Sequence, residues 1–452
     1  MIAVLKGLAY AALLGILGLV AAGASAVALW GAEPAGFQNT LRADRYALFF
    51  TLLVCASTLL VVLMSVDYLR EQPLPAGEFH ALVLLSTCGM VFLAAANDLI
   101  VLFLALEIMS VAVYVLAGLL RREVRSTEAA LKYFLLGAFA TGFLLYGIAF
   151  LYGATGTTRL DLIEATVARQ GLTSWTLLGM AFLLVGFGFK VALIPFHVWT
   201  PDVYEGAPTA VTAFMAVGVK AAAFAAFARV FGGALAGLAP SWTGLLWVLA
   251  ALTMTIGNVT AVRQRSVKRM LAYSSIAHAG YALIGLVAAT RDGGAALLFY
   301  LAVYSFMTLG SFGVLMALGR RGEPNESLDD WAGVGFRYPA LGLSMAVFML
   351  SLAGMPPTAG FTGKFYLFSA AIDAGYVGLA VIGALNSLVS VYYYFGVLVS
   401  MYMTDGTRTI TAPSSRPYLL ATILLTVAAT LAIGIMPGTS MELARSAFAS
   451  LR

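Results

Sequence analysis

Residues 183–223 read LLVGFGFKVALIPFHVWTPDVYEGAPTAVTAFMAVGVKAAA, and this stretch decides the fold. It contains two apolar segments, and each carries a lysine, Lys190 or Lys220, several residues from the polar turn between them. A helix needs about 20 mainly apolar residues to cross the hydrocarbon core of a bilayer. The stretch therefore predicts two membrane-spanning helices, each with a titratable cation inside the membrane.

The composition of the whole chain is typical of a membrane protein. Of its 452 residues, 61% are hydrophobic and 10% are charged, and the mean hydropathy is +0.94. Soluble domains carry about 25% charged residues, and no polar stretch of this sequence is long enough to form one. The alternating pattern of barrel strands is absent, so we expect helices, which satisfy their own backbone groups in lipid.

The apolar pattern predicts thirteen spans, at 5–29, 46–66, 79–96, 98–119, 128–153, 174–204, 207–232, 240–262, 270–289, 294–319, 337–375, 376–403 and 416–437. Two of them, 174–204 and 337–375, are unusually long, and prolines interrupt them at 194–197 and 354–357. Proline removes a backbone donor and clashes with the preceding turn. Broken helices in both halves of a chain indicate an ion pathway built on repeats, whereas either break alone is also explained by a simple kink.

Basic residues are distributed unevenly between the two sides of the membrane. Fourteen lysines and arginines fall in the N-terminal segment and in loops after even-numbered spans, and eight arginines, among them Arg229, fall on the opposite side. The positive-inside rule then places the N-terminus in the cytoplasm and, after thirteen spans, the C-terminus outside. The apolar run 8–30 is longer than the core of a signal peptide, so it is expected to be the first span.

The sequence offers no ligands for a redox cofactor. Its two cysteines, Cys55 and Cys88, lie in apolar runs without a CxxC partner and are expected to be free, buried thiols. The three histidines are far apart, and no GxGxxG or Walker motif is present. We therefore expect no cofactor and no metal on this chain. No basic run is interleaved with aromatic residues, which argues against nucleic acid as a partner.

Four of the six lysines lie inside apolar segments, and these are Lys132, Lys190, Lys220 and Lys364. A charge at the bilayer centre costs roughly 3 kcal/mol or more. Arginine stays protonated at any accessible pH, but a buried lysine can release its proton because burial disfavours the charged form. We interpret the buried lysines as proton carriers.

Glu107 is the clearest acid within a span, in the segment VLFLALEIMSVAVYVL. Its own helix has no lysine at helical spacing, so its counter-ion must come from another helix. We expect Glu107 to face Lys190 or Lys220 across the bundle and to control how tightly that lysine holds its proton. A structural ion pair that only fixes helix packing is the alternative.

Three further candidates have weaker patterns. Lys132 follows Glu128 by four residues, so a surface pair with the lysine extended toward the interface also explains it. His197, in IPFHVWTPD, and His278, in AYSSIAHAGY, adjoin hydroxyl-rich segments that can hold a chain of water. Histidine titrates near neutral pH, which suits a proton relay, although a buried histidine is more often a hydrogen-bonded core residue.

Three long motifs resemble a known family. They are FKVALIPFHVWTPDVYEGAPTAVTAFMAVGVKAA at 189–222, VKRMLAYSSIAHAGY at 267–281 and LSLAGMPPTAGFTGKFYLF at 350–368. From Asp44 to Pro437 the chain is similar to the antiporter-like membrane subunits of bacterial proton-pumping NADH:quinone oxidoreductase (respiratory complex I). The motif PFHVWTPDVYEGAPT favours subunit N over its sister subunits. More distantly, the sequence resembles subunits of multisubunit sodium/proton antiporters.

The resemblance implies two inverted five-helix repeats, each with a broken helix, at 79–232 and 240–403. N-terminal helices at 1–78 precede the repeats, and a C-terminal helix and tail at 404–452 follow them. The family usually has fourteen spans, whereas only one span precedes Asp44 here where two are expected. The resemblance also implies that the family's titratable residues correspond to Glu107, Lys190, Lys220, Lys364, Lys132 and His278.

The resemblance further implies a multi-pass protein of the bacterial inner membrane that translocates protons. Its expected partners are the lipid bilayer and the other membrane subunits of complex I. FMN, iron–sulfur clusters and quinone are expected elsewhere in that assembly. Two other functions fit the same residues: a stand-alone cation/proton antiporter, and a membrane scaffold without transport, in which the lysines would tolerate methionine. A quinone-binding redox protein is disfavoured because cofactor ligands are lacking.

Overall fold

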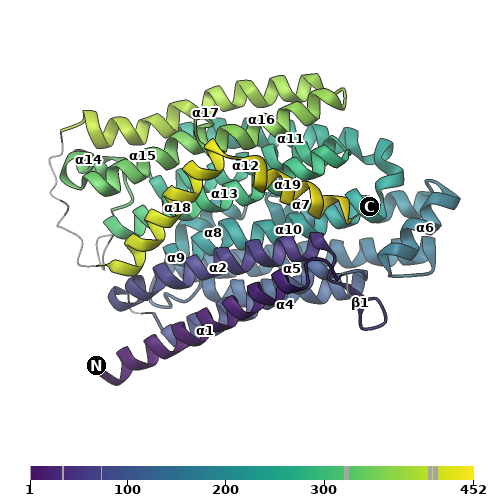
Figure 1. Ribbon diagram of the computed structural model, residues 1–452, viewed down its shortest axis with the longest axis horizontal. Coiled ribbons are helices and arrows are strands. Elements are labelled where there is room, and N and C mark those ends of the chain that lie inside the picture. The colour runs from purple at the N-terminus through teal and green to yellow at the C-terminus, as the bar shows by residue number, and fades with distance from the viewer. Residues whose placement is uncertain are drawn as a thin grey trace.

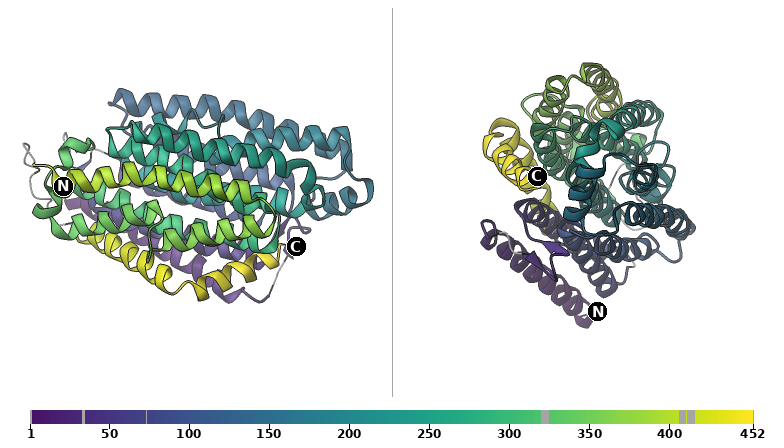
Figure 2. Two further views of the ribbon diagram at one scale, coloured as in Figure 1. Left: turned by 90° about the horizontal axis from the view of Figure 1, so that it is seen from above. Right: turned by 90° about the vertical axis from the view of Figure 1, so that its right-hand side faces the viewer.

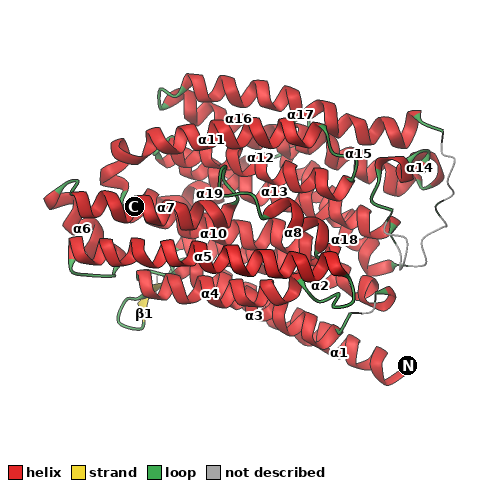
Figure 3. Cartoon of the chain, turned by 180° about the vertical axis from the view of Figure 1, so that it is seen from behind, coloured by secondary structure: helices red, strands yellow, loops and turns green. Residues whose placement is uncertain are grey.

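The computed structural model describes residues 2–32, 35–72, 74–319, 325–405, 410 and 416–451, with only the backbone described for 2–9 and 35. In this part of the chain, twelve helices are long and apolar enough to cross a membrane, or thirteen if one bent pair counts as a span. The helices run side by side along the long axis of the molecule (Figures 1 and 3). The predicted all-α polytopic fold and its number of spans are confirmed.

The helices of the first half are α1 (Ile2–Ala28), α2 (Arg45–Glu71), α3 (Ala76–Ala95), α4 (Leu99–Ala117), α5 (Val124–Thr155), α6 (Leu160–Gln170), α7 (Ser174–Val191), α8 (Thr200–Gly206), α9 (Thr209–Phe214), η1 (Met215–Val219), α10 (Lys220–Ala228) and η2 (Arg229–Ala234). Those of the second half are η3 (Ala236–Leu238), α11 (Ala239–Val262), α12 (Val267–Val287), α13 (Arg291–Leu318), η4 (Leu328–Trp331), α14 (Val334–Arg337), α15 (Pro339–Ala353), α16 (Ala359–Asp373), α17 (Val377–Met403), α18 (Pro417–Ile435) and α19 (Gly438–Ala449). Two short strands, β1 (Ala35–Gly36) and β2 (Leu41–Arg42), form an antiparallel hairpin.

The centre of the bundle is built from helices that are apolar on every side. The continuous span Thr209–Ala234 is fully buried, and α12 and α13 are buried over 94% and 89% of their apolar windows. A helix that is hydrophobic all round has no face for water. The outer helices instead expose large apolar side chains, such as Phe139 on α5 and Leu388 on α17. Polar groups on the central helices must therefore find partners inside the protein.

Both predicted helix breaks are confirmed. After α7, Ala192 has a positive φ of 64°, and helix resumes only at Thr200. After α15, Gly354 has a φ of 86°, and α16 begins at Ala359. A helix end leaves backbone carbonyls without intrahelical partners. Each break therefore places hydrogen-bond acceptors in the interior of the bundle.

The structure corrects two predictions and adds two amphipathic helices. Arg229 lies not in a loop but within the fully buried span, where it forms a bidentate pair with Asp44 at 2.8 Å. Cys88 is a free thiol as expected but is exposed, whereas Cys55 is buried. The amphipathic helices α6 and α19 were not predicted, because each is shorter than a membrane span. Arg320, Arg321, Arg408 and Arg452 lie outside the described residues.

Candidate functional site

Lys190 lies in the last turn of α7 and is only 4% exposed. Its Nζ is 3.5 Å from the Tyr133 hydroxyl of α5, and it lies 5.3 Å from the ring centroid of Tyr114 on α4. Gly137 permits this arrangement, because a Cβ there would lie 2.1 Å from the Tyr114 hydroxyl oxygen. Aromatic faces stabilise a desolvated cation, so the ammonium is accommodated between rings rather than beside a carboxylate.

Glu107, on α4, is half-buried and does not form the direct ion pair that the sequence suggested. Its Oε1 accepts a hydrogen bond of 2.9 Å from Thr141 of α5, and no described lysine lies within 4.0 Å of its carboxylate. A cavity of about 10 Å³, close to the least volume that holds one water, is lined by both Thr141 and Lys190. The charge of Glu107 acts electrostatically on Lys190 and not on Lys220, so of the two expected partners the structure favours Lys190.

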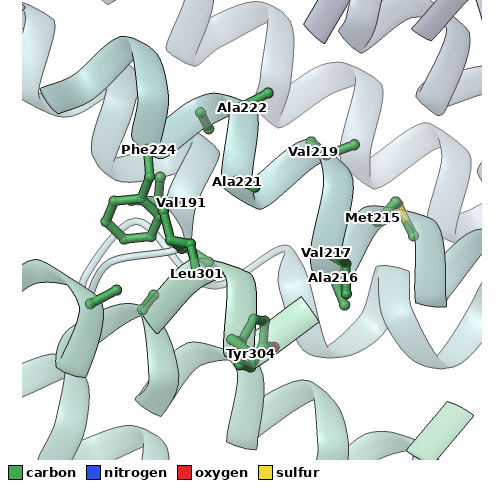
Figure 4. Packing of buried hydrophobic residues seen from close by; sticks show 14 of the residues in the cluster. Val191, Met215, Ala216, Val217, Val219, Ala221, Ala222, Phe224, Leu301 and Tyr304 are labelled. Carbon is green, nitrogen blue, oxygen red and sulfur yellow. The ribbon is translucent and has the colours of Figure 1, made fainter. Parts of the chain in front are cut away.

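Lys220 begins α10 at the centre of the bundle and is 4% exposed. Its Nζ donates to the carbonyl and to the hydroxyl oxygen of Ser275 on α12, both at 2.5 Å. The Tyr304 ring of α13 lies 5.9 Å away. Figure 4 shows apolar residues of this span, Val219, Ala221, Ala222 and Phe224, beside Val191 of α7 and Leu301 of α13. Two oxygens of one residue therefore provide the hydrogen-bond partners of this ammonium.

His278, on α12, is buried and bonded at both ring nitrogens. Its Nδ1 lies 2.6 Å from the Tyr300 hydroxyl, and its Nε2 lies 3.0 Å from the Tyr394 hydroxyl. Tyr394 is also 2.5 Å from the Ser274 hydroxyl. Since Ser274 adjoins Ser275, a row of hydrogen-bonding groups runs from Lys220 to His278.

Lys364, on α16, reaches back across the second helix break. Its Nζ donates to the carbonyls of Leu352 and Ala353, both at 3.0 Å, at the C-terminal end of α15. That end carries partial negative charge, which stabilises a cation. The ammonium also lies 4.6 Å from the ring centroid of Tyr281, whose ring is 5.7 Å from that of His278. Lys364 therefore continues the row that begins at Lys220.

A polar branch leaves this row at Tyr281, and the sequence analysis missed it. The Asn258 amide lies 3.3 Å from the Tyr281 hydroxyl and 3.4 Å from Asn386. Asn386 in turn donates to Thr255 at 3.1 Å. Asn258 and Asn386 each interrupt an apolar span, so the reasoning applied to the lysines could have found them.

Lys132 and His197 lie apart from the row. Lys132 is 41% exposed and contacts Glu128 at 2.6 Å and Asp202 of α8 at 2.8 Å. The predicted i,i+4 pair is thus confirmed and extended by a third residue. His197 lies in the segment between α7 and α8, and its buried Nδ1 has no hydrogen-bond partner among the described residues.

A polar cavity of about 290 Å³ opens where α8 meets α9 and α12. Its lining includes Lys268, Glu205, Glu326 and Thr209. The Lys268 ammonium donates to the Ala207 carbonyl at 2.8 Å and lies 3.3 Å from Glu326. Because its lining combines the buried Lys268 with partly exposed carboxylates, this cavity is a suitable place for water to reach the bundle interior.

These features define a class of protein: a polytopic membrane protein with two broken helices and a row of titratable groups across its centre. Residues 96–390 match the family model described as "NADH:quinone oxidoreductase/Mrp antiporter, TM". The chain belongs to this family of antiporter-like membrane proteins.

Individual proteins and solved structures are similar to this chain over nearly its whole length. The chain is 49% identical over 449 residues to a Trichlorobacter lovleyi protein named NADH-quinone oxidoreductase subunit N, covering 98% of this chain and 91% of the relative. A chain of respiratory complex I from Thermus thermophilus superposes with a TM-score of 0.82 at 38% identity, covering 98% and 99% of the two chains. A chain of the Mrp complex from Dietzia shares the fold, with a TM-score of 0.87 at 23% identity over 98% of this chain and 93% of that one.

Proposed function

We propose that this chain is the antiporter-like subunit N of a respiratory NADH:quinone oxidoreductase and that it translocates protons across a bacterial inner membrane. The identity of about half of all residues with a protein of that name, over nearly the whole length, carries the proposal. FMN, iron–sulfur clusters and quinone belong to other subunits, and this chain performs no redox chemistry itself. Its partners are other membrane subunits of that assembly and the lipid around it.

The proton path begins at the cavity beside Lys268 and reaches Lys220 first. Tyr204 precedes Glu205, which lines the cavity, and interacts with the Ser275 side chain that also binds Lys220. The proton then passes by way of Ser274, Tyr394 and His278, which are joined by hydrogen bonds. The steps from Ser275 to Ser274 and from His278 to Lys364 have no hydrogen bond among the described side chains, so they require water. Hydroxyl and imidazole groups can each accept one proton while donating another.

Lys190 serves a second part of the path, controlled by Glu107. The described side chains contain no hydrogen-bonded bridge from Lys190 to Lys220, so this step requires water. When electron transfer elsewhere in the assembly moves Glu107 relative to Lys190, the ammonium gains or loses a favourable interaction. Moving one charge against 100 mV costs about 2.3 kcal/mol. A change of about a hundredfold in the proton affinity of one lysine supplies about 2.7 kcal/mol, which is sufficient.

The inverted repeats at 79–232 and 240–403 belong to the same proposal. The broken helices α7–α8 and α15–α16 occupy comparable places in the two repeats, and each break lies next to a buried lysine. The N-terminus is cytoplasmic and the C-terminus is outside. α1 starts at the left end of the long axis and α19 ends in the right-hand half (Figure 1), which supports placing the two termini on opposite sides of the membrane. Lys132 and His197 are peripheral members of the path.

Lys220→Arg and Lys220→Met test the relay in membrane vesicles that oxidise NADH. Arginine keeps the positive charge but cannot release its proton, whereas methionine removes the charge. A proton relay predicts that both variants lose most NADH-driven proton uptake while complex assembly, followed on native gels, is retained. If Lys220→Arg pumps like the wild type, the lysine has only a structural role and the relay is wrong. Glu107→Gln is expected to reduce pumping, and Glu107→Asp to preserve part of it.

A cation/proton antiporter is the second candidate, because the family description names both kinds of protein. Sodium-driven proton exchange can be measured in a strain that lacks the other respiratory subunits. This measurement distinguishes an antiporter from a respiratory subunit. Exchange that depends on this chain alone favours the antiporter. Proton uptake that requires NADH oxidation favours the respiratory subunit.

A further inference from the structure

A second cavity, of about 550 Å³, lies between α1, α2, α13 and the C-terminal helices α18 and α19. The right-hand view of Figure 2 shows the N-terminal helices, in purple, beside the C-terminal helices, in yellow. Nearly all lining side chains are aliphatic or aromatic, and only Ser440 among them carries a hydroxyl. A cavity of this size holds a ligand of drug-like volume. We call it the α2–α19 groove.

The groove follows one stripe of α2 from the end of the helix inward. Its lining residues Phe49, Leu52, Leu53 and Ala56 recur at the spacing of one helical face. Arg45, one turn before Phe49, begins the same stripe. With a rise of 1.5 Å per residue, Arg45 to Ala56 spans about 16 Å. That length equals about half of the 30 Å hydrocarbon core, which is one leaflet.

A guanidinium lies one helical turn beyond the last lining residue of α2. Ser440 and Leu443 line the groove from α19, and Ser446 is the next residue on that face. Arg45 donates from Nη1 to the Ser446 hydroxyl at 3.2 Å, which joins the two stripes. The neighbouring carboxylate, Asp44, is engaged by Arg229.

Arg45 has hydrogen-bonding capacity that the described protein groups leave unused. Its Nε is buried without an acceptor among the described residues, and none of their carboxylates lies within 4.0 Å of the guanidinium. A half-buried cation without an anion is unfavourable. The buried Nε is closed to a ligand, but Nη2 has no acceptor among the described residues and is not one of the buried atoms. Guanidinium groups bind phosphate with charge-assisted hydrogen bonds, so a phosphate at this end offsets the charge and accepts from Nη2.

We propose that the α2–α19 groove binds an acidic phospholipid, with one acyl chain along the α2 stripe and its phosphate on Arg45. The apolar lining, the length of one leaflet and a guanidinium without a carboxylate partner at the surface end all match one phospholipid molecule. A neighbouring transmembrane helix fits less well, because it would cross both leaflets. This lipid would fill the space between the N-terminal and C-terminal helices.

Photo-crosslinking in the intact complex tests the site. Benzoylphenylalanine replaces Leu52 in the groove or, as a control, Leu385, which is exposed on α17. Each complex is reconstituted into vesicles of phosphatidylglycerol mixed equally with phosphatidylcholine, and the captured species are identified by mass spectrometry. At Leu52 we expect about tenfold preferential capture of phosphatidylglycerol, equivalent to about 1.4 kcal/mol, and at Leu385 no preference.

Two substitutions test whether the lipid preference depends on Arg45 itself or on positive surface charge in general. Arg45→Gln is expected to abolish the preference at Leu52. Arg445→Gln, which removes an exposed arginine on α19 that pairs with Asp292 at 3.4 Å, is expected to leave it intact. Equal capture of both lipids by the wild-type complex would overturn the proposal without any variant. Capture of a protein segment or of quinone, or a preference that survives Arg45→Gln, would also overturn it.

Discussion

Gly354→Ala perturbs Lys364 without removing it. Gly354 follows α15 with a φ of 86°, and a Cβ built there would lie 2.9 Å from Lys364 Cδ and 3.3 Å from Nζ. Ordinary carbon contacts are about 3.5–4.0 Å, so the lysine side chain must move by about 0.6 Å or more. The flexible lysine yields more easily than the backbone, and its ammonium is displaced from the carbonyls of Leu352 and Ala353.

The displacement is large enough to matter for proton transfer. Both hydrogen bonds from Nζ measure 3.0 Å, and one stretched to about 3.6 Å no longer counts as a hydrogen bond. A hydrogen bond to a charged group contributes about 1.5–3 kcal/mol. Loss of one such bond therefore weakens proton binding to Lys364 by about tenfold or more. We expect NADH-driven proton pumping to fall several-fold.

Gly375→Ala supplies the matched control. Gly375 has the same φ of 86°, but a Cβ there meets no atom within 4 Å. Both variants thus carry the cost of placing alanine in a left-handed conformation, about 1–2 kcal/mol, and only Gly354→Ala touches the lysine. Proton uptake and NADH oxidation are measured in inverted vesicles with equal amounts of assembled complex. Equal pumping by the two variants would refute the role assigned to this contact.

Three further predictions concern the buried ion pair, the tyrosine beside His278 and the orientation of the chain. Asp44→Asn breaks the buried pair with Arg229 but keeps a residue able to cap α2, so it should destabilise the fold by about 3–5 kcal/mol. The amount of assembled complex should fall accordingly. Adding Arg229→Met should restore part of the lost stability, and no recovery argues against the pair. Tyr394→Phe, which removes the hydroxyl at His278 Nε2, should slow pumping more than Tyr393→Phe, whose hydroxyl donates to Asn258 instead; equal effects would exclude this tyrosine from the path. A C-terminal alkaline phosphatase fusion should be active and an N-terminal one inactive, and the reverse pattern would invert the orientation.

Much of the architecture was predictable because a membrane-spanning helix can be recognised from its own segment of sequence. Lipid offers no hydrogen bonds, so each span must be a long apolar run whose backbone bonds are internal. The thirteen predicted segments match helices or broken helices of the structure, and prolines marked both breaks. The short amphipathic helices α6 and α19 carry no such constraint, which explains why they were missed.

The candidate site was predictable in its residues but not in its pairings. The rarity of lysine in apolar runs was sufficient to select Lys190, Lys220 and Lys364, and all three are buried. The tertiary fold decided that none of these three lysines is paired with a carboxylate within 4.0 Å among the described residues. Their partners are instead tyrosine rings, a serine and the carbonyls at a helix end.

The sequence by itself determined that this chain spans a membrane many times and keeps titratable groups inside it. Only the tertiary structure decided which groups meet: Thr141 donates to Glu107 and lines the same cavity as Lys190, and Arg229 pairs with Asp44, 185 residues apart. The reason is physical. A residue's tendency to enter lipid depends on its own chemistry, but a contact between helices depends on how every helix of the bundle is rotated and packed.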